Sequence, residues 1–105
     1  MNFLGEFEQL VMLAIMRRGT NAYGMTIRQE IKEVAGRPAS LGAVYTTLER
    51  LEDKGLISSW IGEATEERGG RSKKYFKVTV PGEAALKQAL RATEAMKKGL
   101  KPVLG

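Results

Sequence analysis

The sequence predicts an α+β fold that is mainly α, with three helices, a β-hairpin and a last helix in that order. Three observations predict this order. Gly19, Gly36 and Gly55 each follow a stretch in which apolar residues recur at the spacing of a helix face. Two short stretches rich in β-branched and aromatic residues then flank a polar loop that contains glycine. Helical spacing returns near the end of the chain, so one small domain with an appended helix is expected.

Three helices are predicted in the first half of the chain, over residues 5–18, 22–35 and 41–54. Ser40 is the predicted N-cap of the third helix, because its hydroxyl can accept a hydrogen bond from an N–H of the first turn. The apolar positions expected to face the core are Phe7, Leu10, Val11, Ala14 and Ile15 in the first helix, Ile27, Ile31 and Val34 in the second, and Leu41, Val44, Leu48 and Leu51 in the third.

The β-hairpin is predicted from residues 56–61 and 73–80. In the second stretch Phe76, Val78 and Val80 alternate with polar residues, so these three side chains are expected to share one face of the strand. The loop between the strands is longer than a tight turn.

The last helix is predicted over residues 81–98. Thr79 is its expected cap, and Pro81 fits the first turn, where its missing N–H is not needed. Residues 99–105 contain two glycines and a proline and are predicted to form a frayed tail.

Composition bounds the function. Lys and Arg total 17 against 12 Asp and Glu, for a net charge of +5, which makes nucleic acid a candidate partner, although simple solubility accounts for the charge equally well. Without Cys or His the chain lacks disulfides, thiolate metal sites and the commonest general base, so no enzyme, metal or cofactor is expected.

The longest apolar run, residues 10–16, is too short to span a membrane, and no signal-peptide pattern opens the sequence. A cytoplasmic location is expected.

Three helices followed by a hairpin is the order of a winged helix-turn-helix DNA-binding domain, here residues 4–80. The third helix is then the recognition helix, with its N-terminal end toward the major groove. When Leu48 faces the core, Thr46 and Arg50 point almost opposite, while small residues at the helix start permit close approach. An exposed Arg50 that pairs with an acidic neighbour is the alternative. The DNA-binding candidates of this helix and its cap are Ser40, Gly42, Ala43, Thr46 and Arg50.

The stretch ERGGRSKKYFKVTV, from Glu67 to Val80, admits three interpretations: a phosphate-binding loop, a flexible basic tail or the tip of a hairpin. It lacks the G-x-x-x-x-G-K-[ST] spacing and lies between strands instead of leading into a helix. The hairpin tip, or wing, is therefore favoured, with basic side chains held toward DNA.

Five stretches in order along residues 4–90 resemble the PadR-type transcriptional regulators: LGEFEQLVMLAI, AYGMTIRQEI, SLGAVYTTLERLEDKGLI, ERGGRSKKYFKVT and PGEAAL. The resemblance implies a sequence-specific DNA-binding regulator, namely a homodimeric repressor that reads a pseudo-palindromic operator in double-stranded DNA. It places Tyr23 and Tyr45 near the DNA backbone and matches Arg71, Lys73 and Lys74 to the basic end of the wing. Burial of Tyr45 in the core, and a wing tip that is merely solvated, are the alternatives.

The resemblance also implies that the last helix packs across the first helix of a second subunit. The residues assigned to this dimer are Phe7, Leu10, Leu86, Ala89, Leu90, Thr93 and Met96. Packing of the same stripe on its own domain is the alternative. The chain resembles the short subgroup, with one C-terminal helix. A small-molecule effector of unknown identity is compatible with this subgroup, but the last helix has no aromatic residue on which a flat drug would stack.

A second function stays open from the residues alone. Acidic side chains are frequent between Glu49 and Glu67. They are compatible with a winged-helix module that binds protein without reading DNA directly.

Overall fold

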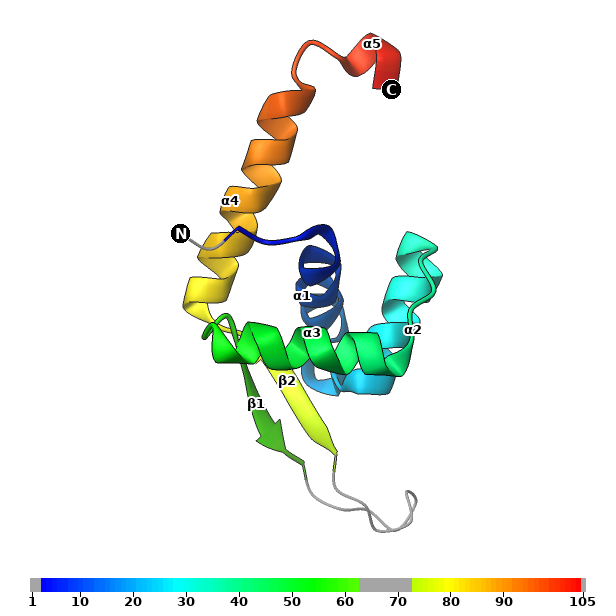
Figure 1. Ribbon diagram of the computed structural model, residues 1–105, viewed down its shortest axis with the longest axis vertical. Coiled ribbons are helices and arrows are strands. Elements are labelled where there is room, and N and C mark those ends of the chain that lie inside the picture. Colours follow the sequence, from blue (N-terminus) through cyan, green and yellow to red (C-terminus); the bar gives the residue numbers. More distant parts are fainter. Residues whose placement is uncertain (1–2, 63–72, 105) are drawn as a thin grey trace.

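The computed structural model describes residues 3–62 and 73–104, and its elements follow the predicted order (Figure 1). Helices α1, α2 and α3 form the body, the antiparallel hairpin extends from it, and α4 leaves it on the opposite side. The bounds are α1 Glu6–Arg18, a 3₁₀ turn Gly19–Asn21, α2 Gly24–Ala35, α3 Leu41–Asp53, β1 Ile57–Ile61, β2 Lys74–Val78, α4 Val80–Lys97 and α5 Lys101–Leu104. The predicted α+β, mainly α, winged helix-turn-helix fold is confirmed.

Capping residues set most of the helix ends. The Ser40 hydroxyl accepts a hydrogen bond from the Ala43 N–H at 3.0 Å and starts α3. The Thr79 hydroxyl accepts one from the Gly82 N–H at 3.1 Å and starts α4. Gly36 ends α2 with φ of 66°, a left-handed conformation that glycine adopts without steric cost. Ser40, Thr79 and Gly36 thus have the capping roles that the sequence predicts.

The second helix begins at Gly24, later than predicted, because the two residues before it pair with the hairpin. The Phe76 N–H donates to the Ala22 carbonyl at 2.9 Å, and Tyr23 and Tyr75 form an isolated antiparallel bridge. Backbone groups that would have extended the helix are instead used to hold β2 against the body.

The hydrophobic core lies where the three body helices meet the inner face of the hairpin. Its largest fully buried side chains are Val11, Met12, Ile15, Ile27, Val44, Leu48, Leu51, Ile57 and Phe76. Burying a side chain of this size contributes about 1.5–3 kcal/mol. Phe7 and Leu10 pack at the edge of this core and are partly buried.

Two predicted core positions are exposed. Val34 has 58% of its surface exposed, because the last turn of α2 diverges from α1 and leaves an open groove that Val34 lines with Leu10 and Leu13. Val80 is 81% exposed, because the chain turns into α4 at that residue instead of continuing the strand.

In the hairpin, β1 and β2 pair in antiparallel register, with Ser59 opposite Phe76 and Trp60 opposite Tyr75. The pairing continues one residue further, since the Gly62 N–H donates to the Lys73 carbonyl at 2.7 Å. The loop that the sequence assigns to the wing tip, with its paired glycines, lies outside the described residues.

Helix α4 projects from the body on the side opposite the hairpin (Figure 1). Leu86 near its start is only 4% exposed and belongs to the core of its own chain, whereas Met96 near its end is 78% exposed. Beyond α4, where the sequence predicted a frayed tail, Lys101–Leu104 forms one helical turn. Pro102 is compatible with it, because proline is tolerated in a first turn. Between residues 3 and 62 and between 73 and 104, no helix is long and apolar enough to cross a membrane.

Substitution Gly82→Ala is expected to lower the free energy of unfolding by about 1–3 kcal/mol. The added methyl group would lie well inside 3.0 Å of the Leu56 carbonyl oxygen. Gly42→Ala is the matched control, because the nearest atom to its added methyl, Ser40 Oγ, is 4.0 Å away. In an open helical position alanine raises stability by about 0.5–1 kcal/mol. Urea unfolding measures both changes, and a loss of equal size in the two variants would contradict the packing of α4 on Leu56.

Candidate nucleic-acid interface

The N-terminal half of α3 presents an open surface. Gly42, Ala43 and Thr46 are exposed, and a methyl group added at Gly42 would meet no atom nearer than 4.0 Å. Ser40 is exposed at the same end, where its hydroxyl caps the helix. The structure therefore brings these four predicted residues together at one end of α3, with room for another molecule to approach the backbone closely.

Arg50 is exposed further along α3. It lies near Glu8, which is 8% exposed and pairs with Lys54 at 3.0 Å. Burial raises the pKa of Glu8, but hydrogen bonds from the Gly5 N–H and from Lys54, together with the charges of Lys54 and Arg50, outweigh burial and lower it. The Glu8–Lys54 pair thus fixes the C-terminal end of α3 against the start of α1.

Tyr45 leans from α3 onto the start of α2 and is 46% exposed. Its hydroxyl lies so close to Gly24 that a methyl group there would come within 2.5 Å of Tyr45 Oη. The ring also lines a shallow pocket with Lys74 and Phe76 of the hairpin. Tyr45 is therefore neither a core residue nor an isolated surface residue: it joins α2, α3 and the hairpin.

Lys74 lies on the face of the hairpin that turns toward α3. Its Nζ is 3.3 Å from Glu52 Oε1 and 5.6 Å from the centre of the Phe76 ring. The Ser59 hydroxyl donates a hydrogen bond to the other carboxylate oxygen of Glu52. That bond, opposed by burial and supported by Lys74, lowers the pKa of Glu52. In this arrangement Lys74, one of the predicted DNA-binding residues, braces the hairpin against α3.

Lys73 lies on the opposite face of the same strand. Its Nζ is 4.4 Å from the centre of the Tyr23 ring, which is within the range of a cation–π interaction. The structure thus brings together two residues that the sequence analysis assigned separately to the DNA backbone. Arg71, the third basic residue assigned to the wing, lies outside the described residues.

A basic face of α2 was missed by the sequence analysis. Met25, Arg28, Gln29 and Lys32 recur at spacings of three and four residues and line a shallow groove of about 290 Å³ with Glu33. Arg28 Nε donates to the Ala39 carbonyl at 2.7 Å, which places the guanidinium beside the turn that leads into α3. The signal for this face was its position opposite the buried Ile27 and Ile31 in the first helix of the pair.

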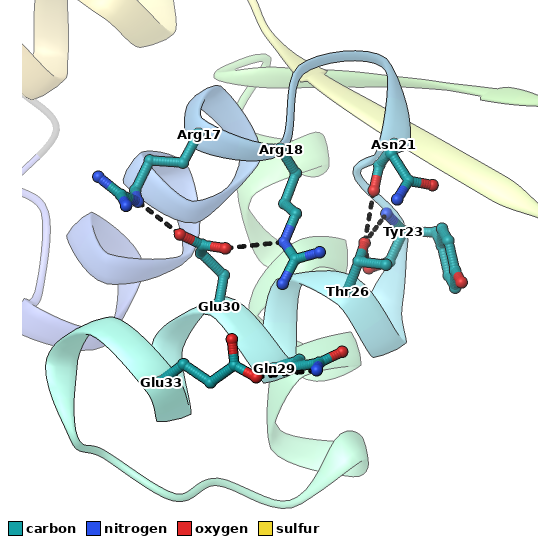
Figure 2. Close-up of polar contacts among 8 residues, drawn as sticks. All are labelled: Arg17, Arg18, Asn21, Tyr23, Thr26, Gln29, Glu30 and Glu33. Atoms are coloured by element: carbon teal, nitrogen blue, oxygen red, sulfur yellow. Dashed lines mark hydrogen bonds and ion pairs between the residues drawn. The ribbon is translucent and has the colours of Figure 1, made fainter.

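Two other arginines are held in an ion-pair network within the body (Figure 2). At the end of α1, Arg17 Nε lies 2.5 Å and Arg18 Nε 2.8 Å from the two carboxylate oxygens of Glu30 in α2. The hydrogen bond from Arg17 is the largest cause of the lowered pKa of Glu30. These arginines join α1 to α2, so we assign them a structural role and not a contact with nucleic acid.

The candidate interface consists of the accessible N-terminal end of α3 and nearby cations. In the part of the chain that is described, no cluster of side chains could hold a metal ion. On the α3 surface, Thr46 lies at this accessible end, whereas the exposed acidic Glu49 and Asp53 follow it toward the C-terminal end. A polyanion would therefore meet the N-terminal half of α3 with less repulsion than the C-terminal half.

Comparison with known proteins places the chain among transcriptional regulators of similar sequence and structure. The model of the transcriptional regulator PadR-like family matches residues 12–88. A PadR-like transcription factor from Bacteroides fragilis is similar in structure, with a TM-score of 0.76 at 28% identity over 92% of this chain and 88% of that chain. A PadR family transcription regulator from Clostridium difficile has a TM-score of 0.70 at 26% identity over 94% and 99%. One from Eggerthella lenta has 0.72 at 25% identity over 94% and 86%. No curated protein matches the chain in sequence.

Substitution Glu52→Gln tests the brace between the hairpin and α3. Because the fold lowers the pKa of Glu52, its carboxylate stabilises the protein above the ordinary value of 4.5, and this contribution disappears as the pH falls through the lowered value. We expect the wild type to be more stable than the variant at pH 7, by less than about 1 kcal/mol because Glu52 is partly exposed, and the difference to vanish in acid.

Chemical denaturation across this pH range measures the difference. Glu49→Gln is the matched control, since Glu49 is exposed on the same helix. A stability difference for Glu52→Gln that stayed constant down to the most acidic pH would contradict the brace.

Proposed function

The chain belongs to the PadR-like family of transcriptional regulators, and we propose that it is a homodimeric repressor that binds a pseudo-palindromic operator in double-stranded DNA. One observation carries the DNA-binding part of this proposal. The exposed N-terminal half of α3 lies close to cations from two other elements: Arg28 of the basic face of α2 donates to the Ala39 carbonyl in the turn before α3, and Lys73 at the base of the wing lies over Tyr23, just before α2. Side chains that can read bases thus lie near side chains that can hold phosphates.

In the proposed complex the start of α3 enters the major groove. Gly42 and Ala43 permit close approach, and Thr46 can contact base edges from the same helix face. Arg50, further along the helix, reaches either a base edge or a phosphate. The exposed acidic groups after Thr46 limit close approach to the first half of the helix, so in the second half only the long side chain of Arg50 reaches the DNA.

Phosphate contacts would hold this orientation. They come from Arg28 and Lys32 of α2 and from Lys73, with Tyr23 beneath it. Tyr45 presents its hydroxyl beside the start of α2. Arg71, matched to the wing by its resemblance to the family, is proposed as a further phosphate contact, whereas Lys74 is assigned a bracing role in place of a DNA contact.

A dimer is proposed because α4 exposes apolar side chains that its own body does not cover. Leu90 is 39% and Met96 78% exposed, and Thr93 lies between them on the helix. Leu10 and Val34 line an apolar groove beside α1 that offers a second unfilled surface. Phe7 and Ala89, partly buried at the edge of the core, complete the assigned interface. Leu86 is withdrawn from it, since the core of its own chain already buries that side chain.

Removing the positive charge of Lys73 is expected to weaken binding to every duplex by a similar factor. Lys73→Ala should reduce affinity about threefold to tenfold and reduce the slope of log K against log salt by about 0.9, the value for one lost phosphate contact. Lys97→Ala is the matched control, because Lys97 pairs with Glu94 on α4, far from the interface. Fluorescence anisotropy at several salt concentrations measures both quantities.

The sequence preference is expected to depend on α3. Selection from a randomised duplex pool should enrich a palindromic motif with the wild type, and Thr46→Ala or Arg50→Ala should relax single positions of that motif, by about 1–3 kcal/mol for a base contact. If no motif is enriched from the pool and binding does not depend on salt, the proposal that the protein recognises a DNA sequence is contradicted. That result would favour a protein-binding module, for which the exposed Glu49 and Asp53 are the supporting observation.

The double substitution Leu90→Glu with Met96→Glu is expected to shift the protein toward monomer and to weaken dimerisation by about tenfold or more, because charge replaces buried apolar surface. Val80→Glu is the matched control: Val80 is 81% exposed on the same helix, and an acidic residue at its N-terminal end suits the dipole. Sedimentation equilibrium measures the dissociation constants. A wild type that is monomeric at all concentrations would overturn the dimer.

A further inference from the structure

Three aromatic rings meet near the loop end of the two strands, at the base of the wing, where Tyr75 of β2 lies between Trp60 of β1 and Tyr23 before α2. We call these three residues the wing-base cluster. Tyr75 stacks on Trp60 with ring centres 5.6 Å apart and planes 20° apart. It meets Tyr23 edge-on, again at 5.6 Å but at 80°. Both geometries are those that aromatic pairs prefer.

Tyr75 is tightly confined on its strand. It is partly buried, it forms the backbone bridge with Tyr23, and its neighbour Phe76 is held to the Ala22 carbonyl. On the β1 side its ring covers Gly62, where an added methyl group would lie well inside 3.0 Å of a ring carbon. The ring of Tyr75 therefore occupies one place, and the edge of the Tyr23 ring rests against it.

The ammonium group of Lys73 rests on this cluster, over the ring of Tyr23. Residues 73 and 75 lie on the same face of the strand, because side chains alternate along it. The Lys73 ammonium is centred 4.4 Å from the Tyr23 ring, the same ring that Tyr75 supports from the side. A lysine side chain has many rotamers, and fixing one of them before binding reduces the entropy lost on binding.

The cluster is not simply an extension of the hydrophobic core. Phe76, on the other face of β2, is 2% exposed and anchors the hairpin to the body, whereas Trp60 in the cluster is 41% exposed. A change at Tyr75 therefore leaves the main anchor of the hairpin in place. What Tyr75 does determine is the place of the Tyr23 ring and of the ammonium above it.

We propose that Tyr75 is a positioning residue for DNA binding: its ring holds Tyr23 so that the Lys73 ammonium is presented at one fixed point to one phosphate. Tyr75 itself does not contact the DNA. This inference rests on the proposed DNA-binding function and adds a residue that acts through Lys73. It uses the ring of Tyr75, so phenylalanine can replace the tyrosine.

The test is a double-mutant cycle on the full chain with a mixed-sequence duplex as the probe, since a phosphate contact does not depend on sequence. Tyr75→Leu should weaken binding about twofold to tenfold and reduce the salt slope by up to about 0.9. Tyr75→Phe should restore wild-type affinity and slope. In a Lys73→Ala background, Tyr75→Leu should have no further effect on either quantity.

A spectroscopic signature shows that the stack itself has changed. Trp60 is the single tryptophan of the chain, so its emission and near-ultraviolet circular dichroism report on the ring that Tyr75 covers. Both signals should change in Tyr75→Leu and be retained in Tyr75→Phe. Lys77→Ala, an exposed change on the same strand, is the control and should alter neither spectrum.

Each outcome decides something. A wild type that binds no duplex would overturn the proposed function and this inference with it. A wild type that binds, with Tyr75→Leu and Lys73→Ala effects that simply add, would overturn the inference alone. If Tyr75→Leu does not fold, Gly62→Ala makes the same test, because its methyl group displaces the Tyr75 ring while all three aromatic residues remain. Unchanged affinity in a folded Gly62→Ala variant with altered Trp60 spectra would also overturn it.

Discussion

The position of the wing depends on one short line of pairing between β2 and the residues before α2. The Phe76 N–H reaches the Ala22 carbonyl at 2.9 Å, and the Phe76 ring fills the core beneath. A two-stranded hairpin by itself is marginally stable in water, so it needs this third partner and the buried ring. The same pairing shortens α2, places Tyr23 next to Tyr75, and thereby fixes the angle between the hairpin and the body.

Alternation along β2 then gives two adjacent lysines different roles. Lys74 shares a face with Phe76, turns toward α3 and meets Glu52, whereas Lys73 shares a face with Tyr75 and meets Tyr23. One charge is thus paired with a carboxylate of α3 at the surface, while the other lies over an aromatic ring at the edge of the candidate interface. A net charge counted over the whole wing would treat the two as equal, although the strand pleat separates them.

Local patterns predicted what local forces determine. The order of elements, the Ser40 cap and the small residues at the start of α3 follow from capping and helical spacing, and each was found where expected. The sequence could not provide the tertiary contacts, that is, how the elements pack against one another. It could not show that Val34 faces an open groove, that Lys74 forms an ion pair with Glu52, or that Arg28 lies beside the turn into α3. Each depends on how far two elements diverge or approach, and apolar periodicity carries no such information.

Helix α4 shows how the proposed dimer and the stability of the single chain are linked. Its first turns are fixed by the Thr79 cap and by Leu86, which is buried in the core. Every residue from Leu90 to Lys97 is exposed, so the second half gains little from its own body. Isolated helical segments of this length are marginal in water, and tertiary packing normally supplies most of their stability. A second subunit that covers Leu90 and Met96 would supply that packing, so the distal half of α4 would be ordered most strongly in the dimer that it forms.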